Sequence, residues 1–125
     1  MFSIIIPTFN NFEYLKLCLN SIKINSKYKH EIILHLNDGS DGSLNYVTEN
    51  KIKHSYSKTN IGLCSSINLA SKMATQKYIL YSHDDMYFCP SWDEYLYHEV
   101  KKLDHDNFYL SGTMIEPNSG HIVFN

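Results

Sequence analysis

The chain has 125 residues, among them 11 lysines and no arginine, and a formal net charge of −2. This length suffices for one domain with a buried core and excludes a two-domain protein, and the near-neutral charge argues against a broad basic surface for nucleic acid. Without arginine, a phosphate group would have to be bound by lysine, backbone N–H groups, a helix N-terminus or a metal ion.

The predicted elements begin with a strand. Residues 2–6 form a short, β-branched apolar run, typical of a strand buried on both faces, and we expect Pro7 to close it. Asn10 and Asn11 can cap a following helix, and the S-x-x-E pattern that begins at Ser91 is a capping box. The further predicted elements are a helix over 12–22, a strand over 31–38, a short helix ending near 50, a strand over 52–56, a helix over 63–74, a strand over 77–81, a helix over 91–103 and a strand over 108–115.

Strands and helices alternate along the chain. Such alternation predicts parallel strands joined by right-handed crossovers, and hence an α/β fold. We expect a three-layer α/β/α, Rossmann-like domain with a mostly parallel sheet. In these folds ligands bind beyond the carboxyl ends of the strands. Polar segments occupy those ends at 7–10, 37–40 and 82–85, so one acidic edge of the sheet is predicted to carry the site.

Asp84 and Asp85 give the sharpest signal. Two adjacent carboxylates at the end of a buried strand repel each other and lose hydration, and no arginine is present to offset their charge. A hard divalent cation, Mn²⁺ or Mg²⁺, is the natural partner and would take further oxygens from substrate phosphates and water. The alternative is a solvated loop in which Asp85 faces water or caps a turn. His83, beside the pair, could contact a ligand.

The other two segments are weaker signals. The carboxylate of Asp38 can accept an N–H from a nucleobase or hydroxyls from a ribose, but its surroundings also favour tight turns without a ligand. Asn60 and Gly62 open a helix whose free N–H groups could face a phosphate, although Gly62 serves equally as a helix-start turn. The chain has neither a P-loop nor a dinucleotide-binding glycine pattern, no serine nucleophile elbow, and no histidine pair with metal-ligand spacing.

Cysteine usage and hydropathy bear on the compartment. The three cysteines are widely spaced and form no C-x-x-C pair, so neither a disulfide framework nor a zinc site is predicted. No apolar run reaches the roughly 18 residues of a membrane span, and the first one lacks the basic start of a signal peptide. We expect a cytoplasmic protein with no transmembrane segment; peripheral attachment to a membrane and a homodimer are compatible with the sequence.

Four motifs follow one another along the chain, at residues 2–10 (FSIIIPTFN), 37–43 (NDGSDGS), 60–70 (NIG, then SINLA) and 78–85 (YILYSHDD). Together they resemble the family 2 glycosyltransferases of GT-A fold, over about residues 2–103. The resemblance implies a hexosyltransferase-like enzyme that moves a sugar, usually with inversion, from a nucleotide-diphospho-sugar to an acceptor hydroxyl. A UDP-sugar is the expected donor, and the acceptor could be a saccharide, a lipid-linked group or a protein.

The resemblance also implies roles for individual residues. Asp38 is similar to the acidic residue that contacts the uracil or another base, and Asp84 to one that contacts the ribose. Asp85, with Asp84 beside it, is similar to the metal-binding D-x-D-like element, where the metal bridges the diphosphate and stabilises the leaving group. The residues implied to bind the nucleotide sugar are Pro7, Thr8, Phe9, Asn10, Asp38, Gly39, Asn60, Gly62, His83 and Asp84.

The chain departs from the family pattern in three places. Ser82 stands at the first acidic position of a full D-x-D-D string, and Ser65 and Ser66 occupy a stretch where the family often has a basic residue. The family's general base, a carboxylate of the acceptor half, has no counterpart here. The carboxylates weighed for that role and not matched to it are Asp93, Glu94, Asp104 and Glu116.

Three functions are therefore compared. The first, which we expect, is a metal-dependent glycosyltransferase in which residues 1–125 are a single GT-A type domain, complete or truncated at its acceptor-binding half. The second is a non-catalytic nucleotide-sugar-binding module of the same fold, which the missing base favours. The third is a magnesium-dependent phospho-acceptor signalling domain. That domain would place its acidic pair after the first strand, where this chain has Pro-Thr-Phe-Asn.

Overall fold

Four parallel strands form the central sheet in the order β3-β2-β1-β4. They are seen in a computed structural model that describes residues 1–115 and the backbone of 122–123. The strands are β1 (Phe2–Phe9), β2 (Glu31–Asn37), β3 (Lys53–Ser57) and β4 (Tyr78–Tyr81), and the helices are α1 (Phe12–Asn25), α2 (Ser43–Glu49), α3 (Leu63–Ser71) and α4 (Trp92–Lys102). This alternation around a parallel sheet confirms the predicted α/β fold.

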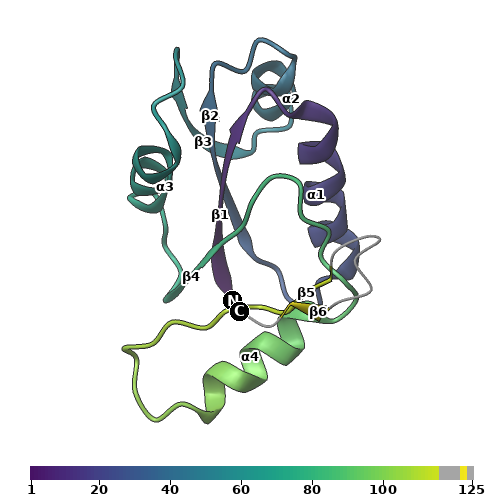
Figure 1. Ribbon diagram of the computed structural model, residues 1–125, viewed down its shortest axis with the longest axis vertical. Coiled ribbons are helices and arrows are strands. Elements are labelled where there is room, and N and C mark those ends of the chain that lie inside the picture. Colours follow the sequence, from purple (N-terminus) through teal and green to yellow (C-terminus); the bar gives the residue numbers. More distant parts are fainter. Residues whose placement is uncertain (116–121, 124–125) are drawn as a thin grey trace.

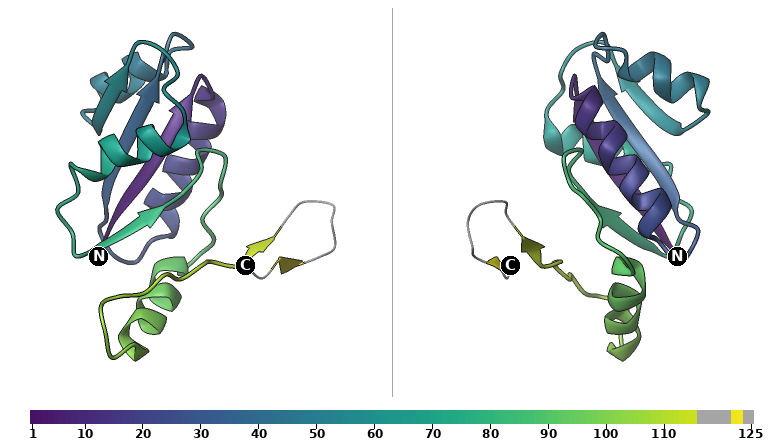
Figure 2. Two further views of the ribbon diagram at one scale, coloured as in Figure 1. Left: turned by 60° about the vertical axis from the view of Figure 1, so that its left-hand side comes forward. Right: turned by 90° about the vertical axis from the view of Figure 1, so that its right-hand side faces the viewer.

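Helices cover both faces of the sheet (Figure 1). α1 and α2 lie on one face and α3 on the other, while α4 lies beyond the end at which β1 begins (Figure 2). Ile4 and Ile6 share a buried core with Leu15 of α1, whereas Ile5 shares one with Ala70 of α3. Alternate side chains of a strand point to opposite faces, so the apolar run of β1 supplies both cores. None of the helices in the described part of the chain is long and apolar enough to cross a membrane.

β1 continues past Pro7 to Phe9, so the expectation that Pro7 ends the strand is wrong. β1 pairs with β4 only as far as Ile5, whose carbonyl oxygen accepts the N–H of Ser82. Alternate residues of a strand bond to the same neighbour, so Pro7 faces a place where β4 has already ended. Its missing N–H therefore costs no ladder hydrogen bond. The extension carries Thr8 and Phe9 out to the carboxyl edge of the sheet.

The predicted strand over 108–115 is largely wrong. Only its last two residues, Met114–Ile115 (β5), form a strand, and this strand pairs antiparallel with Ile122–Val123 (β6), apart from the main sheet. Phe108 instead packs its ring against that of Tyr78, with 5.7 Å between the ring centroids. Phe108 thus contacts β4 through its side chain rather than through backbone pairing, while Tyr109 is exposed.

Asn11 and Ser91 are the N-cap residues of α1 and α4, as predicted, but the expected side-chain cap hydrogen bonds do not form. The carboxylate of Asp41, from the turn after β2, accepts the N–H of Phe12 at 2.9 Å instead. At α4, Ser91 has a left-handed backbone with φ of 60°, and its hydroxyl makes no cap hydrogen bond. The side chain of Asn11 is consequently free to bond elsewhere.

Candidate functional site

A cavity of about 360 Å³ opens at the carboxyl ends of β1 and β2, the edge that the sequence predicts for the site. Seven of its eleven lining residues are predicted from the sequence: Pro7, Thr8, Phe9, Asn10, Asn60, Gly62 and Asp84. The other four are Asn11, Asn37, Leu63 and Ser66. The predicted residues that do not line it are Asp38, Gly39, His83 and Asp85.

Asp84 joins the end of β4 to the end of β1. Its carboxylate accepts a hydrogen bond from the hydroxyl of Thr8 at 2.6 Å and another from the side-chain amide of Asn11 at 3.1 Å. Segments that lie 76 and 73 residues apart in the sequence therefore converge on one carboxyl group. Because a carboxylate has about four lone-pair sites, Asp84 keeps acceptor capacity for a ligand hydroxyl.

Asn10 and Asp38 form a second link, between the ends of β1 and β2. The amide nitrogen of Asn10 donates to Asp38 at 3.1 Å, and its amide oxygen accepts the N–H of Gly39, also at 3.1 Å. Asn10 and Asp38 both have left-handed backbones, with φ of 47° and 63°, which Asn and Asp tolerate better than most residues. The Asp38 carboxylate is thereby fixed beside the cavity-lining Asn10.

Asn37 is a lining residue that the sequence analysis missed. Its buried side chain donates to the carbonyl oxygen of Thr8 at 3.3 Å and to the hydroxyl of Ser66 at 3.0 Å. Its amide oxygen accepts the N–H of Ile61 at 2.9 Å and the hydroxyl of Ser57 at 3.1 Å. One amide thus ties β1, β3 and the start of α3 together. The only sequence signal was a polar residue at the end of an apolar strand.

The connection before α3 brings a helix start to the cavity. Asn60 accepts the N–H of Gly62 at 2.9 Å, which closes a local turn, and Gly62 has φ of 81°. A side chain placed on Gly62 would meet no atom within 4 Å, so open space lies beside it. The hydroxyl of Ser66 donates to the Gly62 carbonyl oxygen at 2.7 Å. Gly62 thus forms part of a turn at the helix start and also lines the cavity.

Asp85 differs from Asp84 in its surroundings. It is exposed, and in the residues that the structure describes no hydrogen bond or ion pair holds its carboxylate. Burial, followed by the charges of Asp84 and Asp85, raises the pKa of Cys18 to about 12, and the same causes raise the pKa of Tyr81. His83 does not enter the cavity lining, and its ring bonds to the Tyr81 hydroxyl at 3.1 Å. The acidic pair therefore leaves a concentrated negative charge at this edge.

The carboxylates of Asp84 and Asp85 fit a metal ion whose remaining ligands come from a substrate and water. Across the described residues, no group of three or more His, Cys, Asp and Glu side chains could hold a metal ion by itself. Asp85 offers a free carboxylate, whereas Asp84 already accepts two hydrogen bonds. Mg²⁺ is commonly bound through one or two carboxylates together with substrate phosphates and water. The two carboxylates thus offer the hard oxygen ligands that such an ion prefers, and oxygens of a bound phosphate would have to complete its coordination.

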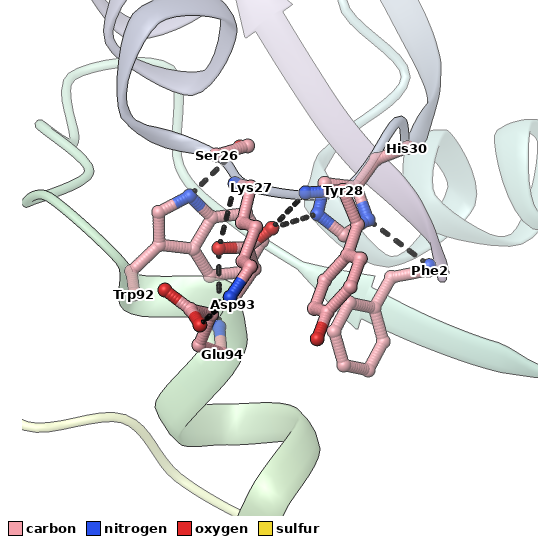
Figure 3. A network of polar contacts seen from close by, with 8 residues as sticks. All are labelled: Phe2, Ser26, Lys27, Tyr28, His30, Trp92, Asp93 and Glu94. Atoms are coloured by element: carbon pink, nitrogen blue, oxygen red, sulfur yellow. Dashed lines mark hydrogen bonds and ion pairs between the residues drawn. The ribbon is translucent and has the colours of Figure 1, made fainter.

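Asp93, one of the carboxylates weighed as a general base, lies far from the cavity. It is fully buried at the start of α4, where its oxygens accept the backbone N–H groups of Lys27 and Tyr28 and bond to Nε2 of His30 (Figure 3). Burial by itself raises the pKa of Asp93, but these hydrogen bonds lower it below its usual value. Asp93 therefore has a structural role, because its carboxylate attaches the start of α4 to Lys27, Tyr28 and His30.

Two more of the carboxylates weighed for the base lie away from the cavity. Glu94 pairs with Lys27 at the start of α4, and the side chain of Asp104 is 97% exposed beyond the end of α4. Neither of them lines the cavity. Glu116, the last carboxylate weighed for this role, falls outside the described residues.

A second cavity, of about 750 Å³, lies at the C-terminal half of α1 and contains no predicted site residue. No Asp or Glu lines it, and its five lining lysines are Lys23, Lys27, Lys29, Lys51 and Lys53. Two of these lysines are paired with carboxylates, Lys27 with Glu94 and Lys53 with Glu31. We therefore place the candidate site at the smaller cavity, where the predicted residues converge.

Comparison with known proteins agrees with the resemblance carried by the motifs. The sequence model described as "Glycosyl transferase family 2" matches residues 3–125. An uncharacterized glycosyltransferase of Rickettsia conorii is 34% identical over 116 residues, which are 88% of this chain and 19% of that protein. One of Mycoplasma genitalium is 35% identical over 97 residues, which are 70% of this chain and 32% of that protein. The chain thus spans 19% to 32% of the length of these relatives.

Solved structures share the arrangement of the sheet and helices. S. aureus TarS 1–349 in complex with UDP superposes with a TM-score of 0.71 at 26% identity, over 81% of this chain and 32% of that one. The mannosyltransferase PcManGT of Pyrobaculum calidifontis, in complex with GDP-Man and Mn²⁺, gives 0.62 at 20% identity, over 82% of this chain and 32% of that one. The second likeness concerns the fold alone.

Proposed function

The chain belongs to glycosyl transferase family 2, and from this premise we propose that the 360 Å³ cavity binds the nucleotide of a nucleotide-diphospho-sugar donor. The observation that carries the proposal is the convergence of two carboxylates, those of Asp38 and Asp84, on the polar end of β1. A TarS structure at 26% identity contains UDP, which supports a UDP-sugar as the donor.

We assign the two carboxylates to the two parts of the nucleoside. Asp38, held by Asn10, would accept an N–H of the base, which uracil offers at N3. Asp84, held by Thr8 and Asn11, would accept a ribose hydroxyl with its remaining lone pairs. Both carboxylates are oriented before a ligand arrives, which lowers the entropy lost on binding.

The diphosphate would lie between Asp85 and the start of α3. Gly62 leaves open space there, and the first N–H groups of a helix have no partner within the helix. With no arginine in the chain, Asp85 would bind Mn²⁺ or Mg²⁺, and Asp84 lies beside it as a second ligand. Such an ion supplies charge stabilisation for the departing diphosphate.

The proposed reaction is sugar transfer with inversion at the anomeric carbon. The bond between that carbon and the diphosphate oxygen breaks, the acceptor oxygen forms the new bond, and its proton passes to a base. None of the described carboxylates weighed as that base lies at the cavity. We therefore propose that the described residues act as the donor-binding part and that the base belongs to an acceptor-binding part.

Calorimetric titration with UDP, with and without Mn²⁺, tests the proposal. We expect Mn²⁺ to tighten UDP binding to the wild-type chain by roughly tenfold or more, which is about 1.4 kcal/mol. Asp85→Ala should lose this gain and keep its affinity for UDP alone. Asp104→Ala, which removes an exposed carboxylate away from the cavity, should behave as wild type. UDP binding that ignores Mn²⁺ in the wild type, or an undiminished gain in Asp85→Ala, contradicts the metal assignment.

A non-catalytic nucleotide-sugar-binding module is the second candidate, favoured by the lack of a base at the cavity among the described carboxylates. The two candidates differ in what they do to a bound donor. A working donor site should slowly release free sugar from a UDP-sugar in a metal-dependent manner. A binding module should hold the donor intact over the same time.

A further inference from the structure

Three side chains on one face of α1 contact the segment that carries the acidic pair, on both sides of the pair. Cys18, Ser21 and Asn25 are spaced by three and four residues, so they form one stripe along the helix. The segment 83–91 runs beside α1 on its way from β4 to α4 (Figure 2). We call these three residues the α1 stripe.

Ser21 and Asn25, the two C-terminal residues of the stripe, bind the N–H and the carbonyl oxygen of Phe88. The N–H of Phe88 donates to the hydroxyl of Ser21 at 3.0 Å, and its carbonyl oxygen accepts the side-chain amide of Asn25 at 2.7 Å. The N–H of Ser91 donates to the backbone carbonyl of Asn25 at 3.0 Å. A connecting segment without regular structure is thus bonded to α1 at three points.

Cys18, the N-terminal residue of the stripe, contacts the residue that precedes the acidic pair. Cys18 is buried, and its Sγ lies 3.7 Å from the carbonyl oxygen of His83, the residue before Asp84. Burial, followed by the charges of Asp84 and Asp85, raises the pKa of the Cys18 thiol to about 12. The thiol therefore keeps its proton at neutral pH and acts as the donor in this contact.

The chain on both sides of Asp85 is consequently fixed. Before it, Asp84 is bonded to Thr8 and Asn11, and after it, Phe88 is bonded to the α1 stripe. The Asp85 carboxylate itself remains exposed.

We infer that Cys18, Ser21 and Asn25 are positioning residues that hold the backbone on both sides of Asp85, and so present its exposed carboxylate to the metal and diphosphate of the donor. This inference rests on the proposed function. Its physical basis is that a carboxylate on a bonded segment loses little conformational freedom when a ligand binds, whereas one on a free loop loses much more. Asp38 and Asp84, the proposed nucleoside contacts, make no hydrogen bond to Ser21 or Asn25, the two stripe residues that bind Phe88.

Asn25→Ala and Asn20→Ala are a matched pair of variants for the test. Both replace an asparagine of α1 by alanine, and Asn20 lies in the helix interior, where a change in helix propensity counts at least as much as at Asn25, the last residue of the helix. Asn20 is exposed, and within the described residues its side chain makes no hydrogen bond. The first readout is amide hydrogen exchange in the ligand-free chain. The Phe88 amide should exchange about tenfold faster in Asn25→Ala and at the wild-type rate in Asn20→Ala.

The second readout is the gain in UDP affinity that Mn²⁺ provides. Loss of an outer partner of a metal site commonly weakens metal affinity about 10- to 100-fold, so Asn25→Ala should lose about tenfold of the gain. Its affinity for UDP alone should stay at the wild-type value. Asn20→Ala should keep both. Ser21→Ala, which removes the other contact to Phe88, is a second variant with the same expected outcome should Asn25→Ala fail to fold.

The contradicting outcomes are distinct. A wild-type chain that binds UDP without any gain from Mn²⁺ contradicts the proposed metal role. A wild-type chain that shows the gain, beside stripe variants that keep all of it, overturns the positioning role alone. Unchanged Phe88 exchange in Asn25→Ala overturns the positioning role whatever the titrations give.

Discussion

Gly39 and Gly62 both have a positive φ, 76° and 81°, which L side chains rarely adopt. Gly62 combines it with ψ of 165°, a backbone region that is essentially restricted to glycine. A Cβ on Gly39 would lie 2.8 Å from the Cβ of Leu44, whereas one on Gly62 would meet nothing within 4 Å. Gly39 is therefore required by packing as well as by conformation, while Gly62 leaves room at the cavity.

Substitution by alanine should separate these two requirements. Gly62→Ala should lose about 1–3 kcal/mol of free energy of unfolding through backbone strain alone. Gly39→Ala should lose about 1–3 kcal/mol beyond its own backbone strain, because its Cβ would overlap Leu44. Urea unfolding of each variant beside the wild type measures the losses. A loss in Gly39→Ala of about 1–2 kcal/mol, no more than backbone strain by itself, would show that the contact with Leu44 relaxes freely.

Individual side chains mark the limit of what the sequence could predict at this scale. The carboxyl-edge rule placed Thr8, Asn10 and Asp84 at one site because it depends only on strand order. Asn37 escaped it, since the four partners of its amide lie 20 to 29 residues away in the sequence. A polar residue at the end of an apolar strand can point either way, and only the packed structure decides.

The docking of α4 shows how an element is held by a few buried groups. His30 accepts the N–H of Phe2 at Nδ1 and therefore carries its own proton at Nε2, which faces Asp93 at 3.0 Å (Figure 3). The His30 ring also stacks on Phe2 and packs against Trp92. Burial lowers the pKa of His30 below its ordinary value of 6.5, although hydrogen bonding to Asp93 opposes this.

Acid should therefore weaken the docking of α4. The unfolded chain takes up a proton on His30 at a higher pH than the folded chain does, so folding stability due to His30 is present above pH 6.5 and falls as the pH drops below it. Asp93, whose folded pKa is also lowered, adds a further loss below about pH 3.8. Urea midpoints between pH 7.5 and 4.5 should fall less steeply in His30→Gln than in the wild type.

His98→Gln is the matched control, because the His98 side chain on α4 is 71% exposed. It should keep the wild-type dependence on pH. Parallel curves for the wild type and His30→Gln would show that another group controls the acid loss.

Elements with a strong apolar pattern were predicted well, and their ends were not. The buried run of β1 was recognised, but Pro7 was taken as its end because the register of β4 against β1 could not be known in advance. The apolar residues over 108–113 suggested a strand, yet Phe108 packs on Tyr78 through its ring. Strand formation depends on a free partner edge, which one segment of sequence does not reveal.

At the scale of the whole molecule, the two ends of the sheet do different work. The carboxyl end carries a cavity lined by Asp84, with Asp38 and Asp85 each next to a lining residue in the chain, and the opposite end buries Asp93 to dock α4. The fold and the family followed from motif order, because four weak motifs in one order constrain the topology together. The absence of arginine became informative only after the acidic residues at the carboxyl edge of the sheet had been recognised.

The central claim is that a nucleotide binds at the carboxyl edge of this sheet. Backbone amide chemical shifts, followed by NMR while UDP and Mg²⁺ are added, test it most directly. The account predicts saturable changes at Asn10, Gly39, Gly62 and Asp84, with the lysine-lined cavity at the other end of α1 unaffected. Changes confined to Lys23, Lys29 and Lys51 around that second cavity, or no saturable change anywhere, would contradict it.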